Sequence, residues 1–96
     1  MIKHIVCFKL KDNSLEECEK AANILKSMDG NVPLLRSIEV GVDFLHSPRS
    51  YDIIMQGTLD DAKALDEYQK DEYHCSVVKK HMHAVAETSV AIDYEL

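Results

Sequence analysis

The sequence contains five histidines and four tyrosines, two residue types that can take part in acid–base chemistry. An imidazole with a pKa of about 6.5 can accept or donate a proton. A tyrosine hydroxyl can donate a hydrogen bond to a carbonyl oxygen that becomes an enolate. His4, Tyr68 and His74 would together suit proton abstraction next to a carbonyl group. The same side chains could instead hydrogen-bond one another and the backbone in a structural role.

Metal and nucleophile chemistry have less support in the residue spacing. The three cysteines form no CxxC pair and no metal-ligand pattern, and we expect reduced thiols at Cys7, Cys18 and Cys75. His81 and His83 would point apart on a helix. His74 and His81 would lie about 10.5 Å apart along a helix axis, too far for one zinc ion. No P-loop or GxGxxG motif is present, and we expect neither a metal nor a cofactor.

Composition and charge narrow the range of partners. The net charge of −6 argues against nucleic acid, which is bound by basic surfaces. No run approaches the roughly 20 apolar residues that span a membrane. The opening residues alternate between apolar and polar, unlike a signal peptide, and we expect a cytoplasmic protein. Ninety-six residues predict one domain, residues 1–96.

The first predicted strand, Ile2–Leu10, has apolar residues on both of its faces. Alternation places a first set of residues on one face: Ile2, His4, Val6, Phe8 and Leu10. The opposite face is also apolar near its middle, at Ile5 and Cys7. A single helical layer can cover only one face of a sheet, so the second face needs a partner. The pattern therefore predicts a homodimer.

Capping residues and periodicity predict the remaining elements. Ser14 opens a capping box before a helix, and Gly30 follows the end of that helix. Asp60 and Asp71 are expected to cap two further helical pieces. The expected helices are Leu15–Met28, Asp61–Gln69 and Glu72–Val85, and the expected later strands are Leu35–Phe44, Tyr51–Leu59 and Thr88–Tyr94.

The order β-α-β-β-α-β predicts an α+β, ferredoxin-like fold. In this fold a four-stranded antiparallel sheet carries both helices on one face, and two bare faces can pack together as a dimeric α/β barrel. We expect the bare face to include Ile5, Cys7, Ile54 and Ala91. On a straight helix Tyr68 and His74 would lie about 120° apart, and the break at Asp71 lets both point toward one cavity.

Four segments of the sequence resemble the stress-responsive A/B barrel (Dabb) family. They are IKHIVCFKLK at residues 2–11, YDIIM at 51–55, LDEYQ at 65–69 followed by His74, and IDYE at 92–95. The resemblance covers nearly the whole chain and implies the same ferredoxin-like dimeric barrel. One departure is clear: the family commonly has His-Pro-x-His, whereas this chain has Asp71-Glu72-Tyr73-His74.

The resemblance also implies two different functions. One plant member of the family closes a polyketide ring with a tyrosine and a histidine beside a buried pocket, and these match Tyr68 and His74, while a further pocket histidine matches His4. This implies a small hydrophobic carbonyl compound as ligand and cyclase-like acid–base chemistry. Another member is a stable oligomer, which implies a non-catalytic, stress-related structural role. Related monooxygenases and haem-degrading barrels commonly use a tryptophan or a well-placed asparagine, and this chain has no tryptophan.

Overall fold

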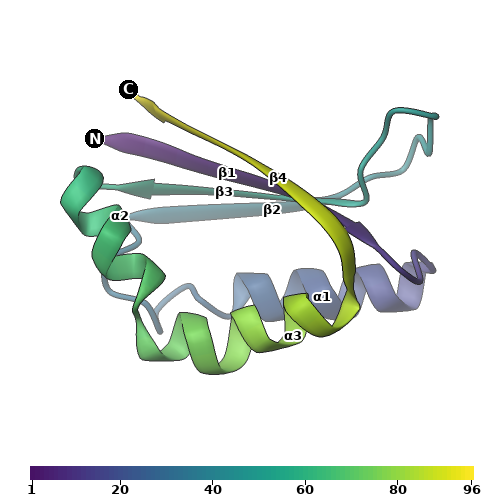
Figure 1. The fold of residues 1–96 in the computed structure, drawn as a ribbon, viewed down its shortest axis with the longest axis horizontal. Helices are drawn as coiled ribbons and strands as arrows, with labels where there is room; N and C mark the ends of the chain where they lie inside the picture. The colour runs from purple at the N-terminus through teal and green to yellow at the C-terminus, as the bar shows by residue number, and fades with distance from the viewer.

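Four antiparallel strands form one sheet in the order β2-β3-β1-β4 in a computed structural model that describes residues 1–96. The strands are β1 (Ile2–Leu10), β2 (Ser37–Val42), β3 (Ile53–Leu59) and β4 (Ala86–Glu95). The helices are α1 (Leu15–Lys26), α2 (Ala62–Gln69), the π-helical segment η1 (His74–Lys79) and α3 (Lys80–Val85). All helices lie on one side of the sheet (Figure 1). The predicted ferredoxin-like fold is confirmed.

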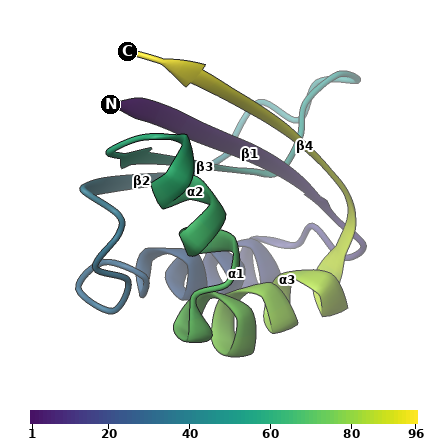
Figure 2. The same cartoon turned by 60° about the vertical axis from the view of Figure 1, so that its left-hand side comes forward.

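The helix-covered face of the sheet holds the hydrophobic core. Val6 of β1 pairs with Met55 of β3, and Phe8 pairs with Ile53. Figure 2 shows α1 and α3 side by side beneath this face. Side chains from both layers are almost completely buried there, among them Leu25, Met28, Leu59 and Tyr68. None of the helices is long and apolar enough to cross a membrane.

Helix α1 begins as the sequence predicts. The Ser14 hydroxyl accepts a hydrogen bond from the Glu17 amide at 3.4 Å. Gly30 follows the helix with a φ of +82°, a left-handed conformation that glycine adopts without strain. The helix ends at Lys26, two residues earlier than predicted. The Ser27 hydroxyl donates to the Ile24 carbonyl of the last turn, which also accepts from the Ser27 amide.

The prediction that Asp60 caps α2 is wrong by one residue. Asp61, not Asp60, is the N-cap residue, and its carboxylate accepts from the Ala64 amide at 2.8 Å. Asp60 instead accepts two hydrogen bonds from the Arg36 guanidinium, at 2.9 and 2.7 Å. Because both oxygens of the Asp60 carboxylate accept from Arg36, this side chain does not cap α2.

The strands differ in length from the predictions, and the prediction that placed Phe44 in a strand is wrong. Strand β2 stops at Val42, and the chain then turns, with Asp43 accepting from the His46 amide at 2.8 Å. His46 has a φ of +53°, which breaks the extended backbone. Phe44 is consequently 89% exposed, on a loop that projects beyond the sheet (Figure 1).

The face of the sheet that the helices leave bare is apolar along β1 and β4. Ile5 pairs with Ile92 and Cys7 pairs with Val90, so these side chains share that face. The prediction that Ala91 belongs to the bare face is wrong. Ala91 pairs with Val6 and therefore points toward the helices.

The helical segment after Asp71 is not a uniform α-helix. Asp71 caps it as predicted, since its carboxylate accepts from the His74 amide at 2.9 Å. One turn later the backbone is π-helical over His74–Lys79 before α3 continues. A π-helix hydrogen-bonds residues five apart rather than four, so the side chains are distributed differently from those of the predicted α-helix.

Candidate functional site

A cavity of about 270 Å³ lies between the helix-covered face of the sheet and the helices η1 and α3. Its sheet wall is made partly by β4, whose helix-facing side chains are small: Ala86, Ser89 and Ala91. Larger residues at these positions would fill the space between sheet and helix. Nine of the fifteen lining residues are hydrophobic, so the cavity suits a small and mainly apolar molecule.

The three candidate residues line this same cavity. The Tyr68 ring lies between the two imidazoles. It is stacked on His74 with a centroid separation of 4.2 Å and an interplanar angle of 25°. It meets His4 edge-on, with a separation of 5.6 Å and an angle of 66°. The break in the helix therefore brings Tyr68 and His74 together, as the sequence analysis predicted.

His4 has a carboxylate partner that the sequence analysis did not identify. His4 and Asp93 are paired directly across β1 and β4, and His4 Nδ1 is hydrogen-bonded to Asp93 Oδ1. A carboxylate at Nδ1 keeps the proton there and leaves Nε2 free to accept one. A signal was present in the sequence: Asp93 alternates with Ile92 and Tyr94, which places its carboxylate on the helix-covered face, the same face as His4.

His74 is half-buried with an unpaired nitrogen. Its Nδ1 atom is buried and makes no hydrogen bond. Burial lowers the pKa of His74, and the nearby Lys79 charge lowers it further, while the Tyr68 backbone and Asp71 act in the opposite direction. The imidazole is therefore favoured in its neutral form, which carries one N–H donor. An unpaired buried polar atom is costly, and a bound oxygen atom would relieve that cost.

The Tyr68 hydroxyl is directed to the core rather than to an acceptor in the cavity. It donates to the Met28 sulfur at 3.6 Å, and Met28 does not line the cavity. Burial raises the pKa of Tyr68 far above its ordinary value, so the hydroxyl stays protonated. The ring orients both imidazoles, while the hydroxyl bonds to a weak sulfur acceptor. No three His, Cys, Asp or Glu side chains gather closely enough to hold a metal ion.

The lowered pKa of His74 predicts a loss of stability in mild acid. The unfolded chain binds a proton at a pKa of about 6.5, before the folded state does, so the free energy of unfolding should fall as the pH drops below that value. Urea denaturation at several pH values measures this. The variant His74→Gln is the control, because it keeps the charged and titratable groups around the imidazole: Lys79, His4 and Asp71. The difference between the stabilities of the wild type and the variant should therefore change with pH. Stability curves that stay parallel over the pH range would contradict the prediction.

Fold and cavity together define a ferredoxin-like α+β domain with a cavity on its helical side. The sequence pattern of the Stress Responsive A/B Barrel Domain, Dabb, matches residues 2–96. The chain therefore belongs to the Dabb family. Among proteins with curated functions, none matches this sequence.

Several solved structures share the fold. A dimeric protein of unknown function from Bacteroides fragilis is 26% identical, with 99% of this chain and 95% of that chain covered and a TM-score of 0.80. A Dabb family protein from Mesorhizobium loti is 23% identical over 99% and 95% of the two chains, with a TM-score of 0.83. A hydroxynitrile lyase from Passiflora edulis is 15% identical over 99% and 92%, with a TM-score of 0.81. The fold thus occurs in proteins of unknown function and in an enzyme.

Proposed function

We propose that this protein binds a small, largely apolar carbonyl compound in the cavity and moves a proton on the carbon next to the carbonyl. One observation carries the proposal: His4, with Asp93 bonded to its Nδ1 atom, lines an apolar cavity together with a histidine that has an unpaired nitrogen. A general base with an orienting carboxylate and a neutral N–H donor are the two groups that enolate formation requires.

The proposed step assigns one role to each side chain. His4 Nε2 takes the proton from the carbon next to the carbonyl, and the released electron pair forms the enolate double bond. The carbonyl oxygen gains the negative charge and accepts a hydrogen bond from the neutral His74 imidazole. Asp93 balances the positive charge on His4. The reverse transfer returns the proton, so a ketone that cannot react further only exchanges its hydrogens with solvent.

The size and the lining of the cavity limit which compounds it can bind. A cavity of about 270 Å³ has the volume of about nine water molecules at about 30 Å³ each. It lies just below the range of roughly 300–1,000 Å³ typical of drug-sized ligands. A single aromatic ring or a short alkyl chain with one carbonyl group matches this volume. The same fold in a hydroxynitrile lyase is compatible with catalysis, but the proposal depends on the side chains of this chain.

Hydrogen exchange of acetophenone in D₂O tests the proposal. The wild-type protein should accelerate deuterium uptake at the acetophenone methyl group, followed by NMR, beyond the rate in the same concentration of free imidazole. The free imidazole is the control because it has the base without the cavity. Exchange at the free-imidazole rate would refute the proposal.

The second candidate function is a non-catalytic, stress-related structural oligomer, and the bare sheet face favours it. Val90, Ile92 and Tyr94 are 49%, 66% and 45% exposed in the single chain. A contiguous apolar surface of this kind marks an interaction site. The similar protein from Bacteroides fragilis is dimeric. We propose that this face joins two copies of the chain, a homodimer that is compatible with either function.

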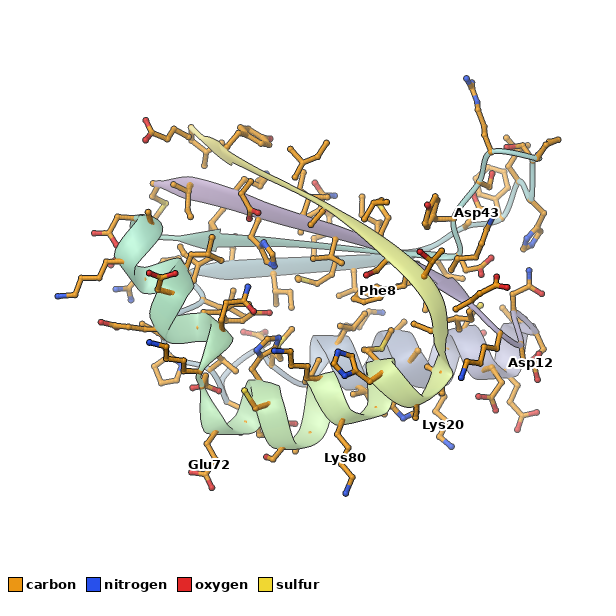
Figure 3. The ribbon with its side chains drawn as sticks, viewed as in Figure 1. Phe8, Asp12, Lys20, Asp43, Glu72 and Lys80 are labelled. Carbon is orange, nitrogen blue, oxygen red and sulfur yellow. The ribbon has the colours of Figure 1, made fainter.

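A charge on the bare face should separate the two copies. Light scattering of the wild type should give about twice the chain mass of 10.9 kDa, since stable interfaces of this kind often bury about 2,000 Å² or more. Ile92→Lys should give the single-chain mass, because it would bury an unpaired ammonium in an apolar interface. Lys20→Glu on α1 is the control and should stay dimeric, since Lys20 points away from the sheet (Figure 3). A wild-type monomer at micromolar concentration would exclude the homodimer.

A further inference from the structure

The cavity lining has a charge balance opposite to that of the whole chain. The protein has 17 acidic and 11 basic residues, yet no aspartate or glutamate lines the cavity. Its titratable lining residues, apart from Tyr68, are all groups that can carry positive charge: Lys79, His4, His74 and His83. Asp93 offsets the charge of His4, and burial favours the neutral form of His74. Lys79 therefore supplies the positive charge of the lining, which favours an anion over a cation as the molecule that enters.

The π-helical segment brings Lys79 to the cavity. On an α-helix Lys79 would lie about 140° around the axis from His74 and would point away from it. In η1 the backbone pairs residues five apart, so Lys79 falls on the same side as His74, and both line the cavity. His83 follows four residues after Lys79, across the junction with α3, and lines the cavity as well.

Lys79 has no anionic partner within the protein. The ion pairs of the chain join His4 to Asp93, Arg36 to Asp60 and His46 to Asp43, and none involves Lys79. Its ammonium group also makes no side-chain hydrogen bond, although the residue is half-buried. An ammonium group without a partner inside the protein gains free energy from a carboxylate that binds in the cavity beside it. The neighbouring Lys80 differs in that it is exposed and points into solvent away from the sheet (Figure 3).

We propose that the compound bound in this cavity carries a carboxylate, which Lys79 and His83 hold, while its apolar body packs between the helices and the small side chains of β4. This deepens the proposed function and rests on it, since it names the substrate class of the same site: a small aromatic or aliphatic carboxylic acid. A phosphate group fits less well, because the cavity offers one ammonium group and no arginine, whereas phosphate is usually held by several donors.

Substitution of Lys79 tests the proposal directly. Benzoate and benzamide have nearly the same shape and differ in charge, and NMR titration of the intact protein measures the affinity for each. The wild type should bind benzoate about tenfold tighter than benzamide, the size of a charge-assisted hydrogen bond reduced by partial solvent exposure. Lys79→Met should remove that preference and leave benzamide binding unchanged. Lys80→Met is the matched control, with the same loss of charge one residue away, and should keep the preference.

Each other result has a distinct meaning. Equal binding of benzoate and benzamide by the wild type would overturn the carboxylate proposal and leave the proposed carbonyl chemistry standing, because the cavity would still be occupied. A preference that survives in a folded Lys79→Met protein would overturn the role of Lys79. If that variant fails to fold, Lys79→Gln replaces it and is expected to lose the preference too. If neither probe shifts the resonances of Val78, Met82 and Ala91, both this proposal and the proposed function are refuted.

Discussion

Replacing His4 with alanine is expected to slow the exchange of acetophenone hydrogens by about 10²–10⁴-fold, the usual contribution of a general base. The imidazole lines the cavity with Nδ1 bonded to Asp93, which leaves Nε2 as the free base. The fold should survive, because the Asp93 side chain is 39% exposed and can be hydrated after its partner is removed. Circular dichroism and urea denaturation check that the variant is folded.

Asp93→Asn is expected to lose nearly as much activity as His4→Ala. An asparagine amide would donate to His4 Nδ1 and favour the tautomer with its proton on Nε2, where the base is needed. The double variant should be no slower than His4→Ala alone, since residues that act as a unit are not additive. A merely structural Asp93 would give independent, additive losses.

His46→Ala is the control for the loss of an imidazole outside the site. His46 lies in the turn after β2 and does not line the cavity. The exchange rate should therefore change by no more than about twofold, as expected for a residue without a role in the step. Equal losses in His46→Ala and His4→Ala would mean that the loss at His4 does not come from its place in the cavity, and that Asp93 has no special function.

The fold was predictable because its signals are local. Alternation in β1 identified the face on which His4 lies, and Ser14, Gly30 and Asp71 marked the helix boundaries. Each of these depends on a few neighbouring residues and on simple geometry. The same is true of the helix break that brings Tyr68 and His74 together.

Two features of the site were not predicted from the sequence, because they depend on contacts or backbone geometry that local patterns do not reveal. The hydrogen bond between His4 and Asp93, which are 89 residues apart in the chain, depends on the register between β1 and β4. The position of Lys79 requires the π-helical backbone, which hydrophobic periodicity does not reveal. The error for Ala91 has a related cause: in β4 the larger apolar side chains, Val90 and Ile92, face away from the helices, while the smaller ones face them and leave the cavity open.

Two substitutions of Tyr68 should distinguish the role of its ring from the role of its hydroxyl group. Tyr68 is completely buried between the sheet and the helices, so Tyr68→Ala should lower the free energy of unfolding by about 3–5 kcal/mol, the cost of truncating a buried aromatic residue. That is a large part of the roughly 5–15 kcal/mol that stabilises a typical protein. Both imidazoles would also lose the surface that orients them.

Tyr68→Phe should have a much smaller effect on stability and exchange. It removes only the hydrogen bond to the Met28 sulfur, at a cost of about 0.5–1.5 kcal/mol, and keeps the ring against His4 and His74. Urea denaturation and acetophenone exchange measure the two properties on the same sample. The resemblance to a ring-closing enzyme implies instead that this tyrosine takes part in the chemistry. A Tyr68→Phe protein that is fully folded but more than about 100-fold slower in exchange, a loss typical of a catalytic group, would assign the hydroxyl to the reaction and not to the core.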